Sequence, residues 1–283
     1  MAEILRGLPV AKAITEDLKK RSEKLREDGI FPRLAIIRVG EREDDISYEN
    51  GALKRCEKAG IETERFLLPA RFDRSILYEI IQRINSDPKF HGCLMFRPLS
   101  DAKAEQNACE LLDPEKDVDC MTSRSLAAVF SGKGKGYPPC TAEAVIELLD
   151  YYGIGIEGKN VVVIGRSLVI GKPVSMLLQA RNGTVTMCHT KTVNMPAVCK
   201  SADILIAAAG CPGLVTEEFV SPEQTVIDVG INVDENGNLC GDVLTDRVSP
   251  IVSAVTPVPG GVGSVTTAVL AKHVILAAEK AGI

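Results

Sequence analysis

The sequence lacks the features that mark zinc proteins and disulfide-rich secreted proteins. Its nine cysteines include no Cys-x-x-Cys pair, and its three histidines, His91, His189 and His273, lie far apart in the chain. A structural zinc site needs Cys and His side chains clustered at ligand spacing. A chain of 283 residues, 45% of them hydrophobic, is long and apolar enough to fold without a disulfide framework. The sequence therefore predicts a cytoplasmic protein with buried thiols and no metal of its own.

The sequence also lacks a basic excess and a long apolar run. Its net charge of -5 and its pI of about 5.4 argue against a nucleic-acid-binding surface, which needs a positive field. No stretch reaches the roughly 18 apolar residues of a membrane span. The first residues, MAEILRGLPVAKAITEDL, contain no uninterrupted apolar run of the kind found in signal peptides. We therefore expect neither nucleic acid nor a membrane among the partners.

The first half of the sequence alternates strand and helix patterns. Short apolar runs predict strands at 34–40, 61–68 and 92–96. Segments with helical periodicity predict helices at 9–28, 46–59, 74–87 and 102–112. Strands separated by helices of this length indicate βαβ units and a parallel sheet.

A second alternation follows a loop rich in Gly, Pro and Lys, SGKGKGYPPC at 131–140. A helix is predicted at 141–153, with Thr141 as its N-cap. Further strands are predicted at 160–165, 184–188, 203–209 and 225–230, with helices in the first two gaps. The last segment, 264–283, is predicted as a helix too hydrophobic to stand free.

This pattern predicts an α/β protein of two domains. The first is a parallel-sheet domain of residues 1–138, onto which the C-terminal helix 264–283 packs back. The second is a Rossmann-like, doubly wound domain of residues 139–263.

The segment VVVIGRSLVIG has the features of a dinucleotide site. An apolar strand leads into Gly165 and a helix begins near Gly171, so a pyrophosphate can approach the backbone and the helix N-terminus. The spacing is Gly-x5-Gly rather than Gly-x-Gly-x-x-Gly, and a plain strand-to-helix turn is the alternative. The next strand ends in CHTKT, without the Asp or Glu that binds a ribose 2′-hydroxyl. Arg166 and Lys191 supply positive charge instead, which favours NADP over NAD unless both are solvated surface charges.

Several segments together resemble the tetrahydrofolate dehydrogenase/cyclohydrolase family. IGRSLVIGKP is similar to its cofactor turn, and TPVPGGVGSVT is similar to its TPVPGGVGPMT signature, with Ser264 and Val265 replacing Pro and Met. PPCTAEAV resembles its PCTP segment with Ala142 for the second proline, and EKDVDC resembles KDVDG with Cys120 for glycine. The match runs in order from about Gly7 to the C-terminus and covers nearly the whole chain.

The resemblance implies a two-domain folate enzyme, with NADP on the C-terminal domain, a cleft between the domains, and a homodimer formed through the cofactor domain. Tyr48 would stack on the aminobenzoyl ring of the folate, and Asp119 would hold the pterin. These two are the candidate catalytic residues. The backbone of Pro259, Gly260 and Gly261 would line the folate pocket. The alternatives are that Tyr48 packs between helices and that Asp119 is a loop or helix N-cap residue.

The resemblance also implies the cofactor contacts. Gly165, Arg166 and Ser167 would hold the cofactor phosphates. Thr190 stands where the family usually has a serine at the 2′-phosphate, so a hydroxyl is kept. Ile231 would meet the nicotinamide side.

Two further departures from the family pattern concern the cyclohydrolase residues. The family's cyclohydrolase lysine lies four residues after the tyrosine, where this sequence has Ala52. The glutamine that supports that lysine is replaced by Phe96 in GCLMFRPLS. Lys54 lies about 200° around the helix from position 52, so it does not simply substitute.

These departures predict which half of the family's chemistry is kept. Hydride transfer from 5,10-methylenetetrahydrofolate depends on position and orientation, whereas hydrolysis of the methenyl product needs an activated water and proton transfer. We therefore predict an NADP-dependent dehydrogenase with little or no cyclohydrolase activity. Two alternatives are a bifunctional enzyme in which Lys54 or Arg97 reaches in after rearrangement, and a homologue that binds folate or nucleotide without turnover.

Overall fold

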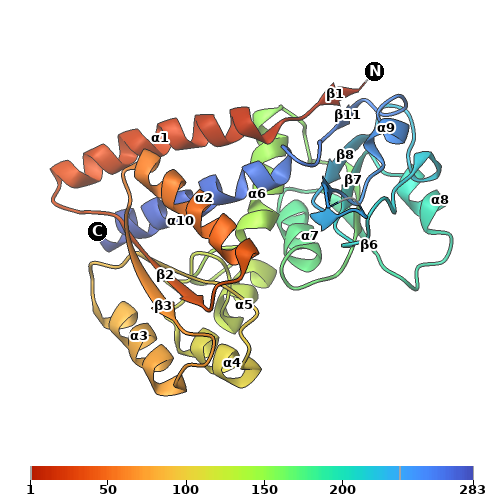
Figure 1. The fold of residues 1–283 in the computed structure, drawn as a ribbon. Coiled ribbons are helices and arrows are strands. Elements are labelled where there is room, and N and C mark those ends of the chain that lie inside the picture. The colour runs from red at the N-terminus through yellow and green to blue at the C-terminus, as the bar shows by residue number, and fades with distance from the viewer. Residues whose placement is uncertain (1, 236, 283) are drawn as a thin grey trace. The chain divides into compact units, whose positions relative to one another are not determined.

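The computed structural model describes residues 2–235 and 237–282, and the chain divides into two compact units (Figure 1). The three-stranded unit consists of Lys12–Cys140 and Thr267–Ile283. The six-stranded unit consists of Met1–Ala11 and Thr141–Thr266. Both are α/β units with parallel sheets, as the sequence predicts.

The three-stranded unit is built on a sheet with strand order β3-β2-β4. Its strands are β2 (Arg33–Val39), β3 (Glu62–Leu68) and β4 (Gly92–Met95), which confirm the three strands predicted for this region. Figure 1 shows α3 and α4 on one side of the sheet and α1, α2 and α10 on the other. The helices are α1 (Gly7–Glu27), α2 (Glu43–Ala59), α3 (Arg74–Ser86), α4 (Ala102–Leu111), α5 (Ser123–Ser131) and α10 (Thr266–Ala281).

Helix α2 packs through one stripe of its surface. Its buried residues recur at a spacing of three and four, which places them on one face: Asp45, Glu49, Ala52, Cys56 and Ala59. Gly60 ends the helix in the left-handed conformation with a φ of 73°, and its N–H bonds back to the last turn. The helix is therefore held against the sheet by small side chains and, of its two buried carboxylates, by that of Glu49.

That carboxylate belongs to an ion pair inside the three-stranded unit. Arg38, at the end of β2, donates its Nε–H to Glu49 Oε2 at 2.6 Å, and both side chains are buried. Arg38 also donates to the carbonyl of Gly40, and Arg65 lies 3.7 Å from Glu49 Oε1. A buried charge is tolerated only when it is paired, so this contact fixes α2 relative to β2.

The six-stranded unit has the strand order β1-β11-β8-β7-β5-β6, with every pair parallel. Its sheet strands are β1 (Glu3–Ile4), β5 (Asn160–Ile164), β6 (Thr184–Cys188), β7 (Ile204–Ala207), β8 (Thr225–Asp228) and β11 (Ala254–Val255). A separate hairpin pairs β9 (Asn232–Val233) with β10 (Leu239–Cys240). The remaining helical elements are α6 (Cys140–Tyr151), α7 (Gly171–Ala180), α8 (Met195–Lys200), α9 (Thr245–Val248), η1 (Glu217–Phe219) and η2 (Val262–Ser264).

The structure differs from the predicted boundaries at two places. Residues 1–11 group with the six-stranded unit rather than with residues 12–138, because β1 pairs with β11 at the sheet edge. A two-residue strand carries no periodicity, so only long-range pairing defines it. Helix α6 begins at Cys140, so Thr141 lies inside the helix and is not its N-cap.

Two buried aspartates hold the loops at the carboxyl ends of β7 and β8. Asp228 accepts hydrogen bonds from the backbone N–H groups of Gly230, Asp242 and Val243. Asp242 accepts from the N–H groups of residues 209–211 and from the side-chain amide of Asn232. A Cβ added at Gly241 would lie 1.8 Å from Asp228 Oδ2, so these loops close tightly around the two carboxylates.

Within residues 2–235 and 237–282, no helix has both the length and the apolar character needed to cross a bilayer. In the same residues, no group of three or more His, Cys, Asp or Glu side chains is arranged to hold a metal ion.

The Arg38–Glu49 pair gives the first prediction. Glu49→Leu leaves the Arg38 charge buried and unpaired, and we expect it to lower the free energy of unfolding by about 3 kcal/mol. The double variant Arg38→Leu/Glu49→Leu should lose less than the single variant, because it removes both charges. Urea unfolding measures both values.

Glu57→Leu is the matched control for that experiment. Glu57 lies on the exposed side of the same helix, so this substitution should change the free energy of unfolding by at most about 0.5 kcal/mol. A double variant less stable than Glu49→Leu would contradict the assignment of the pair.

Asp228 gives a prediction about pH. Burial raises the pKa of Asp228 to about 6, against the opposing effect of its three N–H donors, while an Asp in an unfolded chain has a pKa of about 3.9. The folded protein therefore holds this proton to higher pH than the unfolded chain does. The resulting stabilisation is fully present below about pH 4 and is lost as pH rises through about 6.

Asp228→Asn cannot titrate and provides the comparison. The stability advantage of the wild type over Asp228→Asn should be about 2 kcal/mol larger at about pH 4.5 than at about pH 7.5. Urea unfolding of both proteins at the two pH values measures it. An advantage that instead grows toward neutral pH would mean that the N–H donors outweigh burial.

Candidate active site

Tyr48 and Phe96 meet at the carboxyl end of the three-stranded sheet. Tyr48 lies on α2, and Phe96 follows the last residue of β4 and donates its backbone N–H to the carbonyl of Ile37. The two rings pack edge to face, with centroids 5.9 Å apart and an interplanar angle of 80°. Phe96 is buried and Tyr48 is half-buried, so one ring supports the other.

Ala52 lies one helical turn after Tyr48 and is fully buried, with 0% of its surface exposed. Its position on the same stripe as Glu49 and Cys56 places it against the protein interior. A methyl group and a phenyl ring therefore occupy the two positions at which the sequence departs from the family pattern. Neither group can donate or accept a proton.

The two cations considered as substitutes lie in different surroundings. Lys54 is exposed, and it lines a shallow surface depression with Asn50, Leu53 and Glu57. Arg97 is half-buried and follows Phe96 at the end of β4. Its charge lies close enough to Asp119 to oppose the rise in the pKa of that carboxyl group.

Asp117 and Asp119, the two aspartates of the segment KDVD, have different structural roles. Asp117 is fully buried, and its two oxygens accept the N–H groups of Met121 and Thr122 at 2.8 Å. Thr122, not Asp119, is the N-cap of α5. Asp117 therefore builds the turn, and Asp119 is left for another role.

Asp119 is half-buried, and its side chain contacts Cys140, the first residue of α6. Its Oδ1 accepts the N–H of Cys140 at 3.0 Å, and the thiol of Cys140 is a second donor to the carboxylate. Burial raises the pKa of Asp119, while the Cys140 N–H and the charge of Arg97 oppose that rise. Asp119 thus combines its contacts to the start of α6 with a carboxylate that is only half-buried and can still meet a ligand.

Cys120 occupies a conformation that favours glycine. Its φ is 57°, in the left-handed region, and its side chain is buried. The resemblance places glycine at this position. The chain keeps the turn after Asp119 with a residue that costs about 1 kcal/mol or more there.

In the six-stranded unit, the turn between β5 and α7 is built by close backbone contacts. A Cβ added at Gly165 would lie 2.1 Å from the carbonyl oxygen of Ala208, and one added at Gly171 would lie 2.3 Å from that of Gly165. Ser167 Oγ accepts the N–H of Ile170 at 3.1 Å and closes the turn before α7. Arg166 is exposed, and no acid among the described residues pairs with it.

The loop after β6 lies beside that turn. The register pairs Ile164 with Cys188, so the residues after β5 and β6 emerge at neighbouring positions of one sheet edge. The Thr192 hydroxyl accepts the N–H of His189, and the side chain of His189 accepts the N–H of Lys191. Thr190 and Lys191 are left exposed. Hydroxyl and cationic groups from two loops therefore face the solvent at one edge, an arrangement that suits a phosphate.

Ile231 and the segment PVPGG line one pocket of about 210 Å³ in the six-stranded unit. The loop is tightly folded, since a Cβ at Gly261 would lie 2.4 Å from the carbonyl oxygen of Pro257. Gly260 has a φ of 100° and accepts the N–H of Gly7. Pro259, Gly260, Gly261 and Ile231 are thus brought together within one unit, as are Gly165, Arg166, Ser167 and Thr190 at the turn.

Sequence reasoning missed four charged residues that position these groups. They are Arg38, Glu49, Asp228 and Asp242. For three of them the sequence contains a pattern that could have indicated the role. Arg38 interrupts the apolar run LAIIRVG, Glu49 shares a helix stripe with Ala52, and Asp228 ends the apolar run TVID. Asp242 lies in an irregular loop and has no such signal.

Comparison with known proteins assigns both regions of the chain to one family. The family model described as tetrahydrofolate dehydrogenase/cyclohydrolase, catalytic domain, matches residues 5–119. The model described as the NAD(P)-binding domain of the same family matches residues 139–282. The bifunctional protein FolD of Carboxydothermus hydrogenoformans is 51% identical, with 99% of this chain and 98% of the relative covered.

Two solved structures extend the comparison. The bifunctional FolD methylenetetrahydrofolate dehydrogenase/cyclohydrolase from Campylobacter jejuni is 35% identical, with a TM-score of 0.95 and 99% of each chain covered. The Trypanosoma brucei dehydrogenase-cyclohydrolase, solved with NADP and an inhibitor, is 34% identical, with a TM-score of 0.91 and 99% and 98% of the chains covered. On this evidence the chain belongs to the tetrahydrofolate dehydrogenase/cyclohydrolase family, with a catalytic domain and an NAD(P)-binding domain.

Proposed function

We propose that this protein oxidises 5,10-methylenetetrahydrofolate to 5,10-methenyltetrahydrofolate by hydride transfer to NADP⁺, with little or no hydrolysis of the product. The observation that carries the proposal is the contact of Phe96 with Tyr48 beside the fully buried Ala52. This arrangement keeps an aromatic surface for the substrate and has no proton-transfer group at the two departed positions.

The two reactions of the family place different demands on these residues. The methylene carbon loses a hydride, and the positive charge left behind is shared by the two folate nitrogens. The bound cofactor supplies the hydride acceptor, so the chain's residues need only bind and orient the substrate. Ring opening needs a water held and deprotonated at the same carbon, followed by proton transfer to a nitrogen. Ala52 and Phe96 cannot hold or activate that water, and their apolar groups exclude it.

Tyr48 and Asp119 are proposed to bind the folate. The exposed part of the Tyr48 ring offers a stacking surface for the aminobenzoyl group, and Phe96 fixes the orientation of that ring. The half-buried carboxylate of Asp119 is proposed to accept hydrogen bonds from the pterin N–H groups beside its contacts to Cys140. Pro259, Gly260 and Gly261 are proposed to complete the folate contacts through their backbone.

NADP is proposed as the cofactor in preference to NAD. Gly165 and Gly171 let the turn close tightly on its own backbone, where a Cβ would strike a carbonyl oxygen, and the N-terminus of α7 that follows favours a pyrophosphate. Arg166 is an exposed guanidinium that no described acid pairs with, and Thr190 and Lys191 lie at the neighbouring strand end. Ile231 is proposed to meet the nicotinamide side. The Trypanosoma brucei relative was solved with NADP, which supports this choice.

A homodimer through the cofactor domain is proposed on the apolar surface of the β9–β10 hairpin. Val233 and Leu239 are paired across the hairpin, and 63% and 52% of their surfaces are exposed. Adjacent large apolar side chains at such exposure are typical of an association surface.

A second candidate function is the bifunctional activity. Two relatives that are 50% and 51% identical to this chain in sequence are named bifunctional. Arg97 is a half-buried cation next to Phe96. If Arg97 or Lys54 activated water, the methenyl compound would be opened faster than in buffer.

The catalytic prediction is a gain of function. Wild type should form NADPH from methylenetetrahydrofolate and NADP⁺ while leaving added methenyltetrahydrofolate to open at the buffer rate. Restoring the missing pair in Ala52→Lys/Phe96→Gln should raise the opening rate at least about tenfold, because a placed proton-transfer group contributes about 10²–10⁴-fold. The decay of methenyl absorbance measures the rate.

Lys54→Ala is the control for that assay. It removes the lysine of α2 that lies two residues after position 52 and should change neither reaction. Wild-type opening well above the buffer rate, abolished by Lys54→Ala or by Arg97→Leu, would establish the bifunctional alternative. Absence of NADPH formation would favour a binding protein without turnover.

The cofactor prediction concerns Arg166. Arg166→Ala removes a charge-assisted contact and should raise the KM for NADP⁺ about tenfold or more, with a smaller effect on the KM for NAD⁺. Arg181→Ala is the matched control, since Arg181 is exposed in the same unit and pairs with Asp150. Equal effects of Arg166→Ala on both cofactors would contradict the proposed 2′-phosphate preference.

The assembly prediction concerns the hairpin. Val233→Glu places a charge on the proposed interface and should convert the dimer to monomer in sedimentation velocity experiments. Val193→Glu is the control, because Val193 is 87% exposed on another loop of the same unit. A wild-type protein that sediments as a monomer would exclude the proposed dimer.

A further inference from the structure

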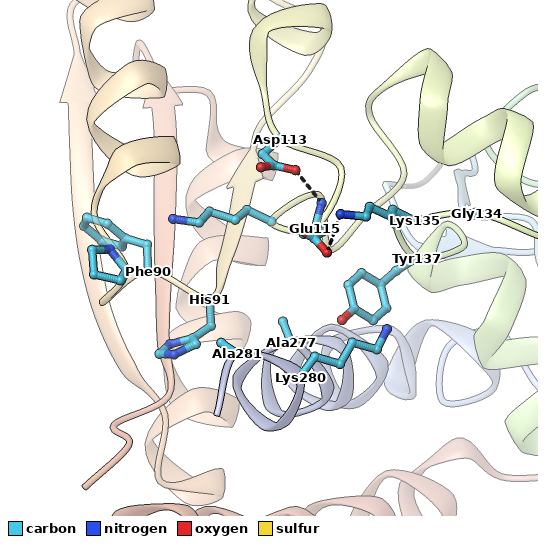
Figure 2. A pocket seen from close by; sticks show the side chains of 13 residues that line it. Phe90, His91, Asp113, Glu115, Gly134, Lys135, Tyr137, Ala277, Lys280 and Ala281 are labelled. Atoms are coloured by element: carbon cyan, nitrogen blue, oxygen red, sulfur yellow. Dashed lines mark hydrogen bonds and ion pairs between the residues drawn. The ribbon is translucent and has the colours of Figure 1, made fainter. Parts of the chain in front are cut away.

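A second pocket lies in the three-stranded unit, away from Tyr48 and Phe96. It is a cavity of about 380 Å³ (Figure 2). His91 in its wall immediately precedes β4, whereas Phe96 immediately follows that strand. The pocket is therefore at the amino end of the strand, and the proposed folate contacts are at its carboxyl end. It is lined by residues of the loops at 113–116 and 134–137 and of the last turns of α10.

Two nearly buried polar side chains in its wall have an unused polar atom. Tyr137 is only 6% exposed, and no group among the described residues bonds to its hydroxyl. His91 is 7% exposed, and its Nδ1 accepts the N–H of Arg33 at 3.2 Å, which leaves Nε2 without a partner in the described part of the chain. Figure 2 shows Tyr137 and His91 on opposite sides of the open space. Neither atom is among the sealed and unpartnered side-chain atoms of the described residues, so both can be reached from the cavity and can bond to a ligand that enters it.

The chemistry of these groups favours an acceptor ligand. Because Nδ1 of His91 accepts a backbone N–H, Nε2 carries the proton of the neutral ring and donates. Burial, with the charges of Lys116 and Arg33, lowers the pKa of His91, so the ring is neutral near pH 7. The Tyr137 hydroxyl is a second donor. The ammonium group of Lys280 lies 4.7 Å from the centre of the Tyr137 ring. It is the third hydrogen-bond donor of the pocket.

The charges of the wall set the charge of the ligand. Lys116, Lys135 and Lys280 face Asp113 and Glu115, which gives three positive and two negative groups, a balance of +1. Lys116 is occupied by the carbonyls of Ile84, Asn85 and Asp87, and Lys135 pairs with Glu115 at 2.9 Å. Lys280 is left as the cation for a ligand. One negative charge fits this wall, and a dianion would be repelled by the two acids.

The rest of the wall is apolar. Phe90, Pro88 and the methyl groups of Ala277 and Ala281 lie around the same space. We propose that this cavity is a binding site for a small monocarboxylate with an apolar body, whose carboxylate accepts from Tyr137 beside Lys280 and whose body packs on the two alanines and on Phe90, on the side of His91.

Benzoate is a suitable probe for this proposal. A ligand of its size is expected to bind weakly, with a Kd of about 10 mM or tighter. In full-length protein labelled at the alanine methyl groups, benzoate should shift the NMR signals of Ala277 and Ala281 in a saturable manner. Localisation by these two methyl groups separates this pocket from the proposed folate site, so the result is independent of whether the protein is a dehydrogenase.

Tyr137→Phe tests the hydroxyl directly. It keeps the ring that stacks on His273 and should weaken benzoate binding at least about fivefold, as the loss of one hydrogen bond to a charged group does. Lys280→Gln should weaken it similarly, and Tyr151→Phe, an exposed tyrosine of the other unit, should leave it unchanged. Circular dichroism confirms that each variant is folded.

Three results would overturn the proposal. The first is no saturable shift of the two methyl signals, which would mean that the pocket holds only water. The second is equal affinity in wild type and Tyr137→Phe. The third is inorganic phosphate that binds at the same methyl groups more tightly than benzoate, which would assign the site to a different anion.

Discussion

The buried ion pair between Arg38 and Glu49 is the contact on which the proposed folate side depends. Glu49 is the neighbour of Tyr48 and lies one turn before Ala52 on the buried stripe of α2. Because an unpaired charge is so costly inside a protein, the pair fixes both the rotation and the position of the helix on β2. Tyr48 is then presented to Phe96, and Ala52 is turned inward. The same constraint therefore orients the ring that is proposed to face the substrate and leaves a methyl group, rather than a proton-transfer group, at position 52.

In the six-stranded unit, two buried carboxylates have the corresponding role. Asp228 and Asp242 gather the N–H groups of three loops at the carboxyl ends of β7 and β8. Ile231 and the segment PVPGG line their pocket next to these loops. Glycines at the close approaches complete the arrangement, because a Cβ at Gly165, Gly171 or Gly241 would strike neighbouring atoms. The turn between β5 and α7 is thus specified by backbone packing, and Arg166 gives it an exposed positive charge.

Much of this architecture was predictable, and the exceptions have physical reasons. Apolar runs predicted the strands β2 to β8, and helical periodicity predicted the long helices between them. Each of these elements buries a continuous or periodic apolar face. β1 and β11 have two residues each and exist only through long-range pairing. The departures at Ala52 and Phe96 were visible in the sequence, but the edge-to-face contact with Tyr48 was not. The pocket lined by Tyr137 and His91 could not be predicted from the sequence either, because its walls come from segments far apart in the chain.

The central claim is that hydride transfer has been kept while water activation has been lost. The most direct measurement is the product ratio in one reaction, with NADPH and methenyltetrahydrofolate followed together as methylenetetrahydrofolate is consumed. The account predicts that one methenyl molecule accumulates for each NADPH formed, apart from slow opening at the rate of the enzyme-free buffer. NADPH that appears with 10-formyltetrahydrofolate in place of the methenyl compound would contradict it.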